Sequence, residues 1–543
     1  MRSISILILS AAVAPGCGPG ELASDTVDAS DAAASTQDDA SGAPTTTSLP
    51  PTSTADSEPT TGAEASTSGD ASTGGEDSTT EEPAASAHPK WLRGFGDGDG
   101  QVGTTVASAP DGSVVVAGMV LGSFAMDGVM VANLAGGPDL VLAKLSPAGK
   151  VLWARVFASD LVVGPAPTEL AVLDSGDILL GGTFAEALDL GDGPIAAKSK
   201  SSRSDIFVAR FDAGGELLWT RTFGGDQQAL SRMTADAQGN ILLSGSFQGA
   251  LSFGGAPLNS PAGEQDPFVV KLAGTGDLLW NRTFHLETVL GSVWGDSPMA
   301  GSDAQGNVYV AGDHFSGELD PGGVKLVGEG ALEDAYLAKY DPEGALVWAR
   351  NFPKQGTEGL IRVDDLVVQA DGTAWLGGDL FEEPSGSIAF GGGAIAGDCG
   401  VATCVFLGAV AADGQPLRAL TLRGTDQLAL SRMTSDRAGG LILAGYFTGT
   451  VVLGPHTLAN GYLPRDEYLS DKFVARLDAS GTPLWALPLV PSDGSASLRA
   501  VSVDSAQRVA VTGLFFPDHL TLGPMSVMSA GKGDLFVAQI EPD

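Results

Sequence analysis

The stretch FVARFDAGGELLWTRTFGG, from Phe207 to Gly225, is one copy of a phrase that recurs along this chain. LVLAKLSPAGKVLWARVF from Leu140 and YLAKYDPEGALVWARNF from Tyr336 repeat it with the same internal spacing. An acidic residue is followed five positions later by a basic residue, and a Trp stands nine positions after that. Two apolar runs on either side of a turn that contains Gly predict a β-hairpin.

A second, shorter phrase precedes the first one in each copy. DAQGNILLSG at 236–245 returns as DAQGNVYVAG at 303–312 and as DRAGGLILAG at 436–445. Its first Gly suits a turn position with positive φ, and its second lies where Gly marks a bulge or a close backbone approach. The two phrases occur in seven copies of about 65 residues, each with at least four strands. This pattern predicts an all-β fold, a seven-bladed β-propeller over residues 90–543.

The two ends of the repeat region predict how the ring closes. The seventh copy stops at DLFVAQIEPD and lacks the last strand of the longer phrase, whereas KWLRGFG at 90–96 has the spacing of that strand. We therefore expect the first strand to complete the last sheet, which removes an open sheet edge.

A Trp closes the longer phrase and serves as the structural marker of the repeat. In five of these strands Trp, Arg and Phe alternate and so share one strand face, as Trp219, Arg221 and Phe223 do. An aromatic stripe that binds a ligand and packing between neighbouring sheets both fit this pattern, and its recurrence around the ring favours packing. The marker residues are Trp91, Trp153, Trp219, Trp280, Trp348 and Trp485.

Residues 1–17 have the pattern of an export signal. Arg2 precedes an apolar segment from Ile4 to Ala14 that is too short to cross a bilayer. The segment ends at APGC, which resembles the lipobox of bacterial lipoproteins. That resemblance implies that Cys17 becomes the lipidated first residue, and Gly18 after it implies the outer membrane or cell surface. An ordinary signal peptide with an incidental Cys is the alternative.

Residues 18–89 form a Ser-, Thr-, Pro- and acid-rich segment with 14 acidic residues and no Lys or Arg. It contains too little apolar surface to offset the entropy of ordering, so we predict a disordered tether. The whole chain has a formal net charge of −37. This charge argues against nucleic acid and against electrostatic docking on anionic lipid, because both need a basic surface.

The fifth copy departs from the repeat. Cys404 stands at the acidic position, Ala409 at the basic position and Arg418 at the Trp position, so that the three features disappear together and suggest a single unit. Cys399 precedes Cys404 within the segment CGVATC. In an exported chain two such neighbouring cysteines predict a disulfide. A metal or redox pair is the alternative, but a redox motif has two intervening residues and this one has four.

The longer phrase resembles the SBBP-type seven-bladed β-propeller repeats of bacterial surface proteins, over residues 90–543. RFDAGGELLW also resembles the tryptophan-docking repeat of quinoproteins and of an outer-membrane assembly lipoprotein. These resemblances imply a fold that hosts many functions. We predict a surface-anchored, non-catalytic binding or scaffolding module. An enzyme of quinoprotein or lyase type with a site in a central channel, or an outer-envelope assembly factor, stays open.

The segments between the hairpins vary most in length, and loops that vary are the usual place for binding residues. We expect them on one face of the ring, where 285–299, 381–403 and 447–470 are the candidate surface for a protein or glycan partner. We expect a monomer held at the membrane by its lipid.

Searches for chemistry give no catalytic residue, cofactor site or metal site. The chain has no G-x-S-x-G, P-loop or H-E-x-x-H motif. GDGQVG at 98–103 is not followed by a helix pattern, and DGDG at 97–100 lacks the rest of a calcium loop. His314 replaces a Phe of other copies, which indicates a packing residue.

Overall fold

The structure is a computed structural model whose compact unit spans Pro83–Asp543. The predicted signal segment with Cys17, and residues 18–85 of the predicted tether, lie outside the residues that the structure describes. The described residues are 86–543 without 135–136, 159–168, 199–204, 262–264, 289–297, 315–316, 329–333, 356–359, 382–386, 392–393, 396–398, 400–402, 437, 461–469, 493–494 and 517.

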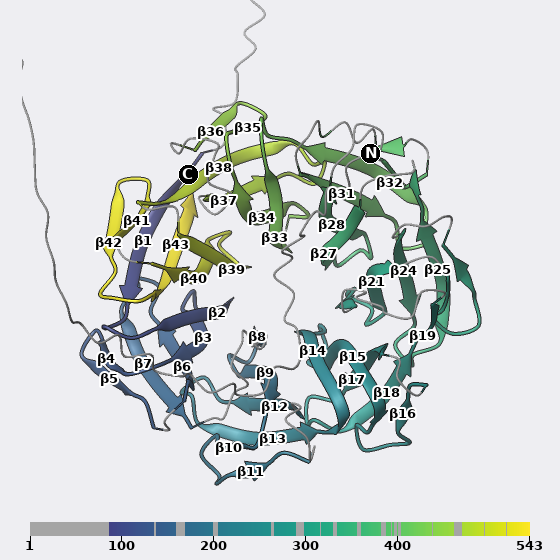
Figure 1. Ribbon diagram of the computed structural model, residues 1–543, viewed down its shortest axis with the longest axis horizontal. Helices are drawn as coiled ribbons and strands as arrows, with labels where there is room; N and C mark the ends of the chain where they lie inside the picture. Colours follow the sequence, from purple (N-terminus) through teal and green to yellow (C-terminus); the bar gives the residue numbers. More distant parts are fainter. Residues whose placement is uncertain are drawn as a thin grey trace, which may run out of the picture. The chain divides into compact units, whose positions relative to one another are not determined.

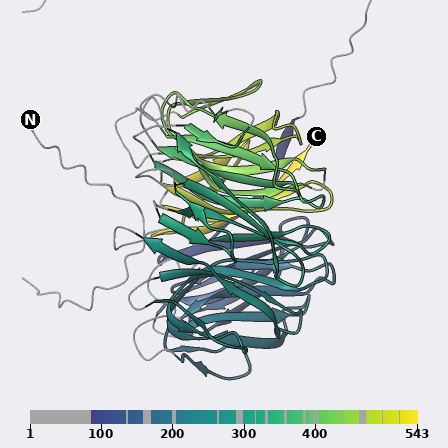
Figure 2. The same cartoon turned by 90° about the vertical axis from the view of Figure 1, so that its right-hand side faces the viewer.

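Seven antiparallel sheets, the blades, each with four main strands, surround a common axis (Figure 1), which confirms the predicted seven-bladed β-propeller. Each blade runs from an innermost strand near the axis to an outermost strand at the rim, and Figure 2 shows the ring edge-on. Blade 1 consists of β2 (Gln101–Ser108), β3 (Val114–Val120), β6 (Asp139–Leu145) and β7 (Val151–Phe157). Blade 2 consists of β8 (Glu169–Val172), β9 (Ile178–Phe184), β12 (Asp205–Phe211) and β13 (Leu217–Phe223). Blade 3 consists of β14 (Gly225–Ala235), β15 (Ile241–Leu251), β17 (Gln265–Leu272) and β18 (Leu278–Thr283).

The remaining blades follow the same order. Blade 4 consists of β20 (Met299–Ser302), β21 (Val308–His314), β24 (Asp334–Tyr340) and β25 (Leu346–Phe352), and blade 5 of β27 (Leu360–Val368), β28 (Ala374–Phe381), β31 (Cys404–Val410) and β32 (Pro416–Leu422). Blade 6 consists of β33 (Leu428–Ser435), β34 (Leu441–Phe447), β37 (Asp471–Leu477) and β38 (Pro483–Pro491). Blade 7 consists of β39 (Ala496–Val503), β40 (Val509–Phe515), β43 (Asp534–Pro542) and β1 (Ala87–Phe95). The described residues contain no helix that is long and apolar enough to cross a membrane.

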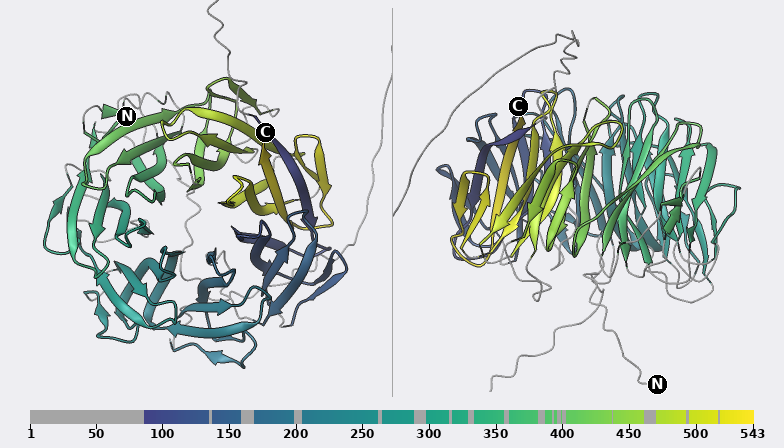
Figure 3. Two further views of the ribbon diagram at one scale, coloured as in Figure 1. Left: turned by 180° about the vertical axis from the view of Figure 1, so that it is seen from behind. Right: turned by 90° about the horizontal axis from the view of Figure 1, so that it is seen from above.

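The first strand of the chain completes the last blade, as predicted. β1 pairs antiparallel with β43 from Ala87 opposite Pro542 to Phe95 opposite Leu535 (Figure 3). Lys90 and Glu541 form an ion pair of 3.2 Å beside this ladder. β1 begins at Ala87, slightly ahead of residue 90, where the sequence repeat begins.

Between its second and third strands each blade carries short extra strands at the rim, which the sequence pattern did not predict. We call these the peripheral hairpins. Several pair with the continuation of the preceding blade's outermost strand: β19 (His285–Thr288) with β22, β26 (Lys354–Gln355) with β29, and β38 with β41. The strands are β4 (Ser123–Met126), β5 (Val129–Ala132), β10 (Ala187–Leu188), β11 (Ile195–Ala196), β16 (Leu258–Asn259), β22 (Gly317–Asp320), β23 (Leu326–Val327), β29 (Ser387–Ala389), β30 (Ala394–Ile395), β35 (Thr450–Leu453), β36 (His456–Ala459), β41 (His519–Leu522) and β42 (Met525–Met528).

The two repeated glycines have the backbone positions that the sequence predicted. The turn residue has positive φ even where it is not Gly, with 78° at Gly112 and 64° at Gln507. The strand Gly lies opposite a bulge in the innermost strand, and a Cβ at Gly445 would lie 2.1 Å from the Ala429 carbonyl oxygen. Only Gly allows this close approach.

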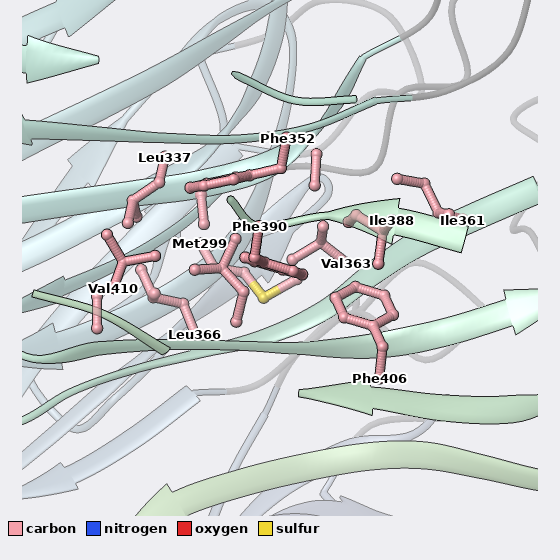
Figure 4. Packing of buried hydrophobic residues seen from close by; sticks show 14 of the residues in the cluster. Met299, Leu337, Phe352, Ile361, Val363, Leu366, Ile388, Phe390, Phe406 and Val410 are labelled. Atoms are coloured by element: carbon pink, nitrogen blue, oxygen red, sulfur yellow. The ribbon is translucent and has the colours of Figure 1, made fainter. Parts of the chain in front are cut away.

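The hydrophobic core is divided into clusters that lie between adjacent blades. In the cluster between blades 4 and 5, Phe352 of β25 stacks on Phe390 with ring centroids 4.8 Å apart, and Phe406 of β31 packs beside them (Figure 4). Each blade therefore buries its two faces against its neighbours, so a single missing strand affects two clusters.

We predict that deleting residues 86–96, which removes β1, destabilises the whole ring. Trp91, Leu92 and Phe95 are all more than nine-tenths buried, and losing one buried aromatic side chain alone costs about 3–5 kcal/mol. Urea unfolding should show a large loss of unfolding free energy, partly recovered by a synthetic peptide of residues 86–96. A deletion of equal length within the predicted tether, residues 60–70, is the control. Equal stability of both deletions would contradict the proposed closure.

Candidate functional site

The repeated Trp side chains lie between neighbouring blades. The indole N–H of Trp91 donates to the Pro147 carbonyl at 3.2 Å, and that of Trp280 to the Pro342 carbonyl at 2.9 Å. A Cβ on Gly149, in the same turn as Pro147, would lie 2.6 Å from the Trp91 ring. The turns of blades 1 and 4 are therefore each shaped by the Trp of the blade before it.

The contact between the ring and the turn Gly also holds for Trp153 against Gly215, Trp219 against Gly276, and Trp348 against Gly414. The indole N–H of Trp348 donates to the Ala412 carbonyl at 3.0 Å. In blade 5, where Arg418 stands at the Trp position and is exposed, the side chain of Leu420 lies against Gly481 instead. The Arg that alternates with Trp and Phe on the same strand also binds the turn of the next blade, because Arg93 donates to the Gly149 carbonyl at 3.0 Å.

Trp485 differs from the other five, because it faces the closing blade. There the chain ends at β43 and begins at β1, so no turn joins the third and fourth strands. Trp485 is 2 % exposed, and its indole N–H has no hydrogen-bond acceptor within the described part of the chain. It packs instead on Leu520 and Leu522 of the last peripheral hairpin.

In blades 3, 4 and 6 the repeated basic residue pairs with a buried Asp at the turn of the same blade. Lys271 lies 2.9 Å from Asp236, and Arg476 lies 2.7 Å from Asp436. Burial alone would raise the pKa of Asp236, but hydrogen bonds from Asn240 and Lys271 lower it. Lys271 also donates to the Gly306 carbonyl of the next blade at 3.0 Å, which ties the two blades together.

The repeated acidic residue has a separate position at the other end of the third strand. Asp139 accepts the backbone N–H of Leu134, just after the peripheral hairpin, and Asp205 accepts that of Lys198 at 2.5 Å. The acidic residue thus fixes the exit of the hairpin, whereas the basic residue fixes the turn. The prediction that the acidic residue, the basic residue and Trp act as one unit is therefore wrong.

In blade 5 the predicted disulfide between Cys399 and Cys404 is present. Cys404 is the first residue of β31, at the position of the repeated acidic residue, and Cys399 stands five residues earlier. Leu134 stands at the same separation from Asp139, so the disulfide links covalently the two positions that a hydrogen bond links in blade 1.

A ring of charged side chains lies on the innermost strands, and the sequence analysis did not identify it. One position, seven residues before the turn Gly, holds Glu169 in blade 2, Arg232 in blade 3, Asp365 in blade 5 and Arg432 in blade 6. Arg232 lies 3.1 Å from Asp365, and Arg432 lies 3.7 Å from Glu169. Both ion pairs join blades that are not neighbours, so the side chains reach towards each other around the axis.

The carboxylates of this ring are also bound to backbone. Asp365 is fully buried and accepts the N–H of Met433 in the next blade at 2.8 Å. Burial raises the pKa of Glu169, against the opposing effect of Arg432 and Arg232. Burial alone would lower the pKa of Arg232, but Asp365 and Glu169 raise it. The ring therefore holds opposite charges in a poorly solvated region, where their interactions are strong.

A second group of charges lies within blade 5. Arg362 lies 2.6 Å from Asp364 and 3.2 Å from Asp379, and Asp379 accepts the N–H of Leu430 in blade 6 at 2.9 Å. Burial raises the pKa of Asp379 to about 7, although Arg362 and the Leu430 N–H oppose this shift.

A sequence signal for the ring does exist. The five residues LSRMT occur at 230–234 and again at 430–434, in blades 3 and 6, and each contains the Arg of the ring. A comparison of repeats usually looks for residues that all copies share. Here two copies have an Arg at the same repeat position and two others have an acidic residue, so the comparison misses the pattern.

The predicted loop surface is described only in part. Parts of all three segments lie outside the described residues. These parts are 289–297 in segment 285–299; 382–386, 392–393, 396–398 and 400–402 in segment 381–403; and 461–469 in segment 447–470. The described part of 447–470 forms the hairpin of β35 and β36, not an open loop.

Two residues that the sequence analysis considered, Asp97 and His314, form hydrogen bonds within the fold. Asp97, in DGDG, accepts hydrogen bonds from the Ser123 N–H at 3.0 Å and the Gln101 amide at 2.7 Å. His314 is 1 % exposed, and its Nε2 lies 2.9 Å from Asn351 Oδ1. Within the described residues, no group of three or more His, Cys, Asp or Glu side chains is arranged to hold a metal ion.

The peripheral hairpins carry the most exposed large apolar side chains of the described residues. Met528 is 77 % exposed, Met130 69 %, and Val452 59 %, each on a different hairpin. Leu134, directly after β5, is 63 % exposed, and Val327 on β23 is 55 % exposed. These side chains lie on blades 1, 4, 6 and 7.

Comparisons of the sequence with known proteins do not show a family for this chain. No protein-family model matches it. The regulatory protein FlaEY of Caulobacter vibrioides is 30% identical over 172 residues, which are 31% of this chain and only 17% of that relative. The match thus spans a small part of FlaEY.

Solved structures are similar at low identity. A protein of unknown function from Dyadobacter fermentans has a TM-score of 0.36 and 10% identity, covering 84% of this chain and 99% of its own. An ulvan lyase of polysaccharide lyase family PL25 has a TM-score of 0.39 and 10% identity, covering 78% and 93%. A lignostilbene dioxygenase of Pseudomonas brassicacearum has a TM-score of 0.35 and 12% identity, covering 84% and 93%. None of these similarities carries information on function.

We predict that the disulfide of blade 5 and the repeated Asp are partly interchangeable. Replacing both cysteines, with Cys399→Ser and Cys404→Ser, should lower the unfolding free energy by about 2 kcal/mol, as expected for a short closed loop. The pair Cys399→Ala and Cys404→Asp should lose less, because Asp can accept a backbone N–H there. Urea unfolding measures both losses. An equal loss in the two variants would show that the Asp does not replace the disulfide.

Proposed function

We propose that this protein is an exported, lipid-anchored β-propeller that acts as a non-catalytic binding or scaffolding module at the outer membrane or cell surface. The signal pattern of residues 1–17, the lipobox-like APGC at Cys17 and the polar segment 18–89 support the anchor and its tether. The phrase repeated over residues 90–543 supports membership of the SBBP-type repeats.

The proposed binding role is supported by exposed apolar side chains on the peripheral hairpins. The repeated Trp and basic residues contact neighbouring strands and turns, whereas Met130, Val327, Val452 and Met528 extend from the peripheral hairpins into solvent. The hairpins differ in sequence from blade to blade. A rigid ring with variable apolar projections is suited to holding a partner surface.

The chemistry of these side chains favours a protein partner over a glycan. Exposed Met and Val offer adaptable apolar contacts without the hydrogen-bonding groups that a sugar requires, and Met is enriched at protein interfaces. The net charge of −37 favours a partner with a basic surface, because complementary charge speeds encounter.

We predict that charged substitutions on the hairpins reduce capture of partners from envelope extracts. Met130→Asp combined with Met528→Asp should lower the captured amount several-fold, because both side chains leave an apolar contact. Leu152→Asp combined with Leu279→Asp is the matched control, since these residues are 53 % and 51 % exposed on outermost strands. Quantitative mass spectrometry of pull-downs measures the effect. Undiminished capture by the hairpin variant would overturn the proposed surface.

We predict that Cys17→Ser releases the protein from membranes. Without the thiol no lipid can be attached, so the variant should move from the membrane fraction to the soluble extracytoplasmic fraction, with its tether intact. Fractionation and incorporation of labelled fatty acid measure this. Ser10→Ala, within the same signal segment, is the control. Absence of labelled fatty acid from the parent protein would exclude a lipid anchor at this residue.

A further inference from the structure

Two of the peripheral hairpins hold a pair of methionines each, and the two members of a pair differ in burial. In blade 1, Met126 on β4 is fully buried, whereas Met130 on β5 is 69 % exposed. In blade 7, Met525 packs on a core cluster, whereas Met528 on the same strand, β42, is 77 % exposed. Each of these hairpins therefore presents one thioether to solvent and keeps the other against the protein.

The other methionines of the described residues are covered, because each packs on a core cluster between blades. Met433 shows how closely one of them fits: a Cβ at Gly377, on β28 of the preceding blade, would lie 2.9 Å from its Sδ. A solute from solvent cannot reach such a sulfur without opening the core. These covered residues are Met119, Met233, Met299 and Met433.

The two exposed methionines are open to a small solute. Their hairpins belong to adjacent blades and lie on either side of β1, the strand that closes the ring (Figure 1). Met130 pairs across its hairpin with Ala125, whose side chain is too short to cover it. Met528 pairs with His519, whose side chain is itself 48 % exposed.

We propose that Met130 and Met528 are oxidation sites, at which hydrogen peroxide converts the thioether to the sulfoxide and weakens binding at the peripheral hairpins. The sulfur gives two electrons to the peroxide, whose O–O bond breaks. One oxygen forms the bond to sulfur, and the other takes up the protons and leaves as water. The product is a reversible modification that turns an apolar side chain into a polar one.

The effect of this oxidation on binding rests on the proposed function, because Met130 and Met528 are two of the apolar projections offered there to a partner. The proposed position outside the reducing cytosol also brings both thioethers into contact with such an oxidant. The selectivity of the oxidation rests on burial alone and needs no partner.

Oxidation rates of the purified full chain with Cys17→Ser test the two sites. The protein is treated with hydrogen peroxide for increasing times, and peptide mass spectrometry with fragmentation measures the sulfoxide at each methionine. Met130 should oxidise at least about tenfold faster than Met126, its buried neighbour on the same hairpin, and Met528 should likewise oxidise faster than Met433. Equal rates within either comparison would contradict the proposed sites.

The melting temperature separates this oxidation from damage to the core. Protein in which Met130 and Met528 are oxidised should melt at the temperature of the untreated protein, because neither side chain contributes to a core cluster. A lower melting temperature at this stage of oxidation would show that the two side chains support the fold, against the proposal.

Capture from the envelope extract tests the effect on binding. Oxidation confined to Met130 and Met528 should lower the captured amount several-fold. The pair Met130→Gln and Met528→Gln, which is polar like the sulfoxide, should do so without oxidant. The pair Met130→Leu and Met528→Leu has no thioether at either site, so peroxide should leave its capture at the level of its own untreated sample. Peroxide-dependent loss in the Leu pair would assign the effect to other residues.

This proposal and the proposed function fail in different ways. If neither the Asp pair used above nor the Gln pair lowers capture, the hairpins are not the binding surface, and oxidation does not regulate binding there. If the Asp pair lowers capture but oxidation of Met130 and Met528 does not, the hairpin surface stands and its control by oxidation is rejected.

Discussion

The contact between the outermost-strand Trp of one blade and the turn of the next is the interaction on which this ring depends. A four-stranded sheet with two apolar faces cannot be stable alone, and each blade covers the faces of its neighbours. The Trp adds direction to this packing: its indole N–H binds a turn carbonyl, and its ring fills the space that a Cβ at the turn Gly would need. The spacing between Trp and turn is therefore fixed for five of the six Trp residues, and Trp485 is the exception.

Three further interactions stabilise the ring at different distances from its axis. The buried ion pair of base and turn Asp, such as Lys271 with Asp236, holds the inner turn of a blade. The repeated Asp holds the exit of the peripheral hairpin, and in blades 4, 5 and 7 the hairpin itself pairs with the continuation of the preceding blade's outermost strand. In blade 5 a disulfide takes the place of the repeated Asp contact and Leu420 takes the place of the Trp contact, while the sheet keeps its four strands.

The ring is not symmetric where its chemistry is concentrated. The closing blade is formed by both ends of the chain, and Trp485, which faces it, lacks an acceptor such as those of Trp91, Trp280 and Trp348. On the innermost strands, Glu169, Arg232, Asp365 and Arg432 occupy one repeat position with alternating charge and bind across the axis. A regular scaffold thus presents two irregular regions, the apolar hairpins at the rim and the charges at the axis. The proposed partner belongs to the first of these regions.

The sequence by itself determined the repeat, the number of blades, the closure by the first strand and the pairing of Cys399 with Cys404. Each of these depends on spacing along the chain, because strands, turns and a short disulfide loop are local, and the matching ends of KWLRGFG and DLFVAQIEPD leave one closure. Only the tertiary structure decided which blade each side chain contacts. The peripheral hairpins are too short to show a strand period, and Arg232 meets Asp365 only because ring closure brings non-neighbouring blades together. Contacts across the axis depend on the curvature of the whole ring, which no local pattern of residues contains.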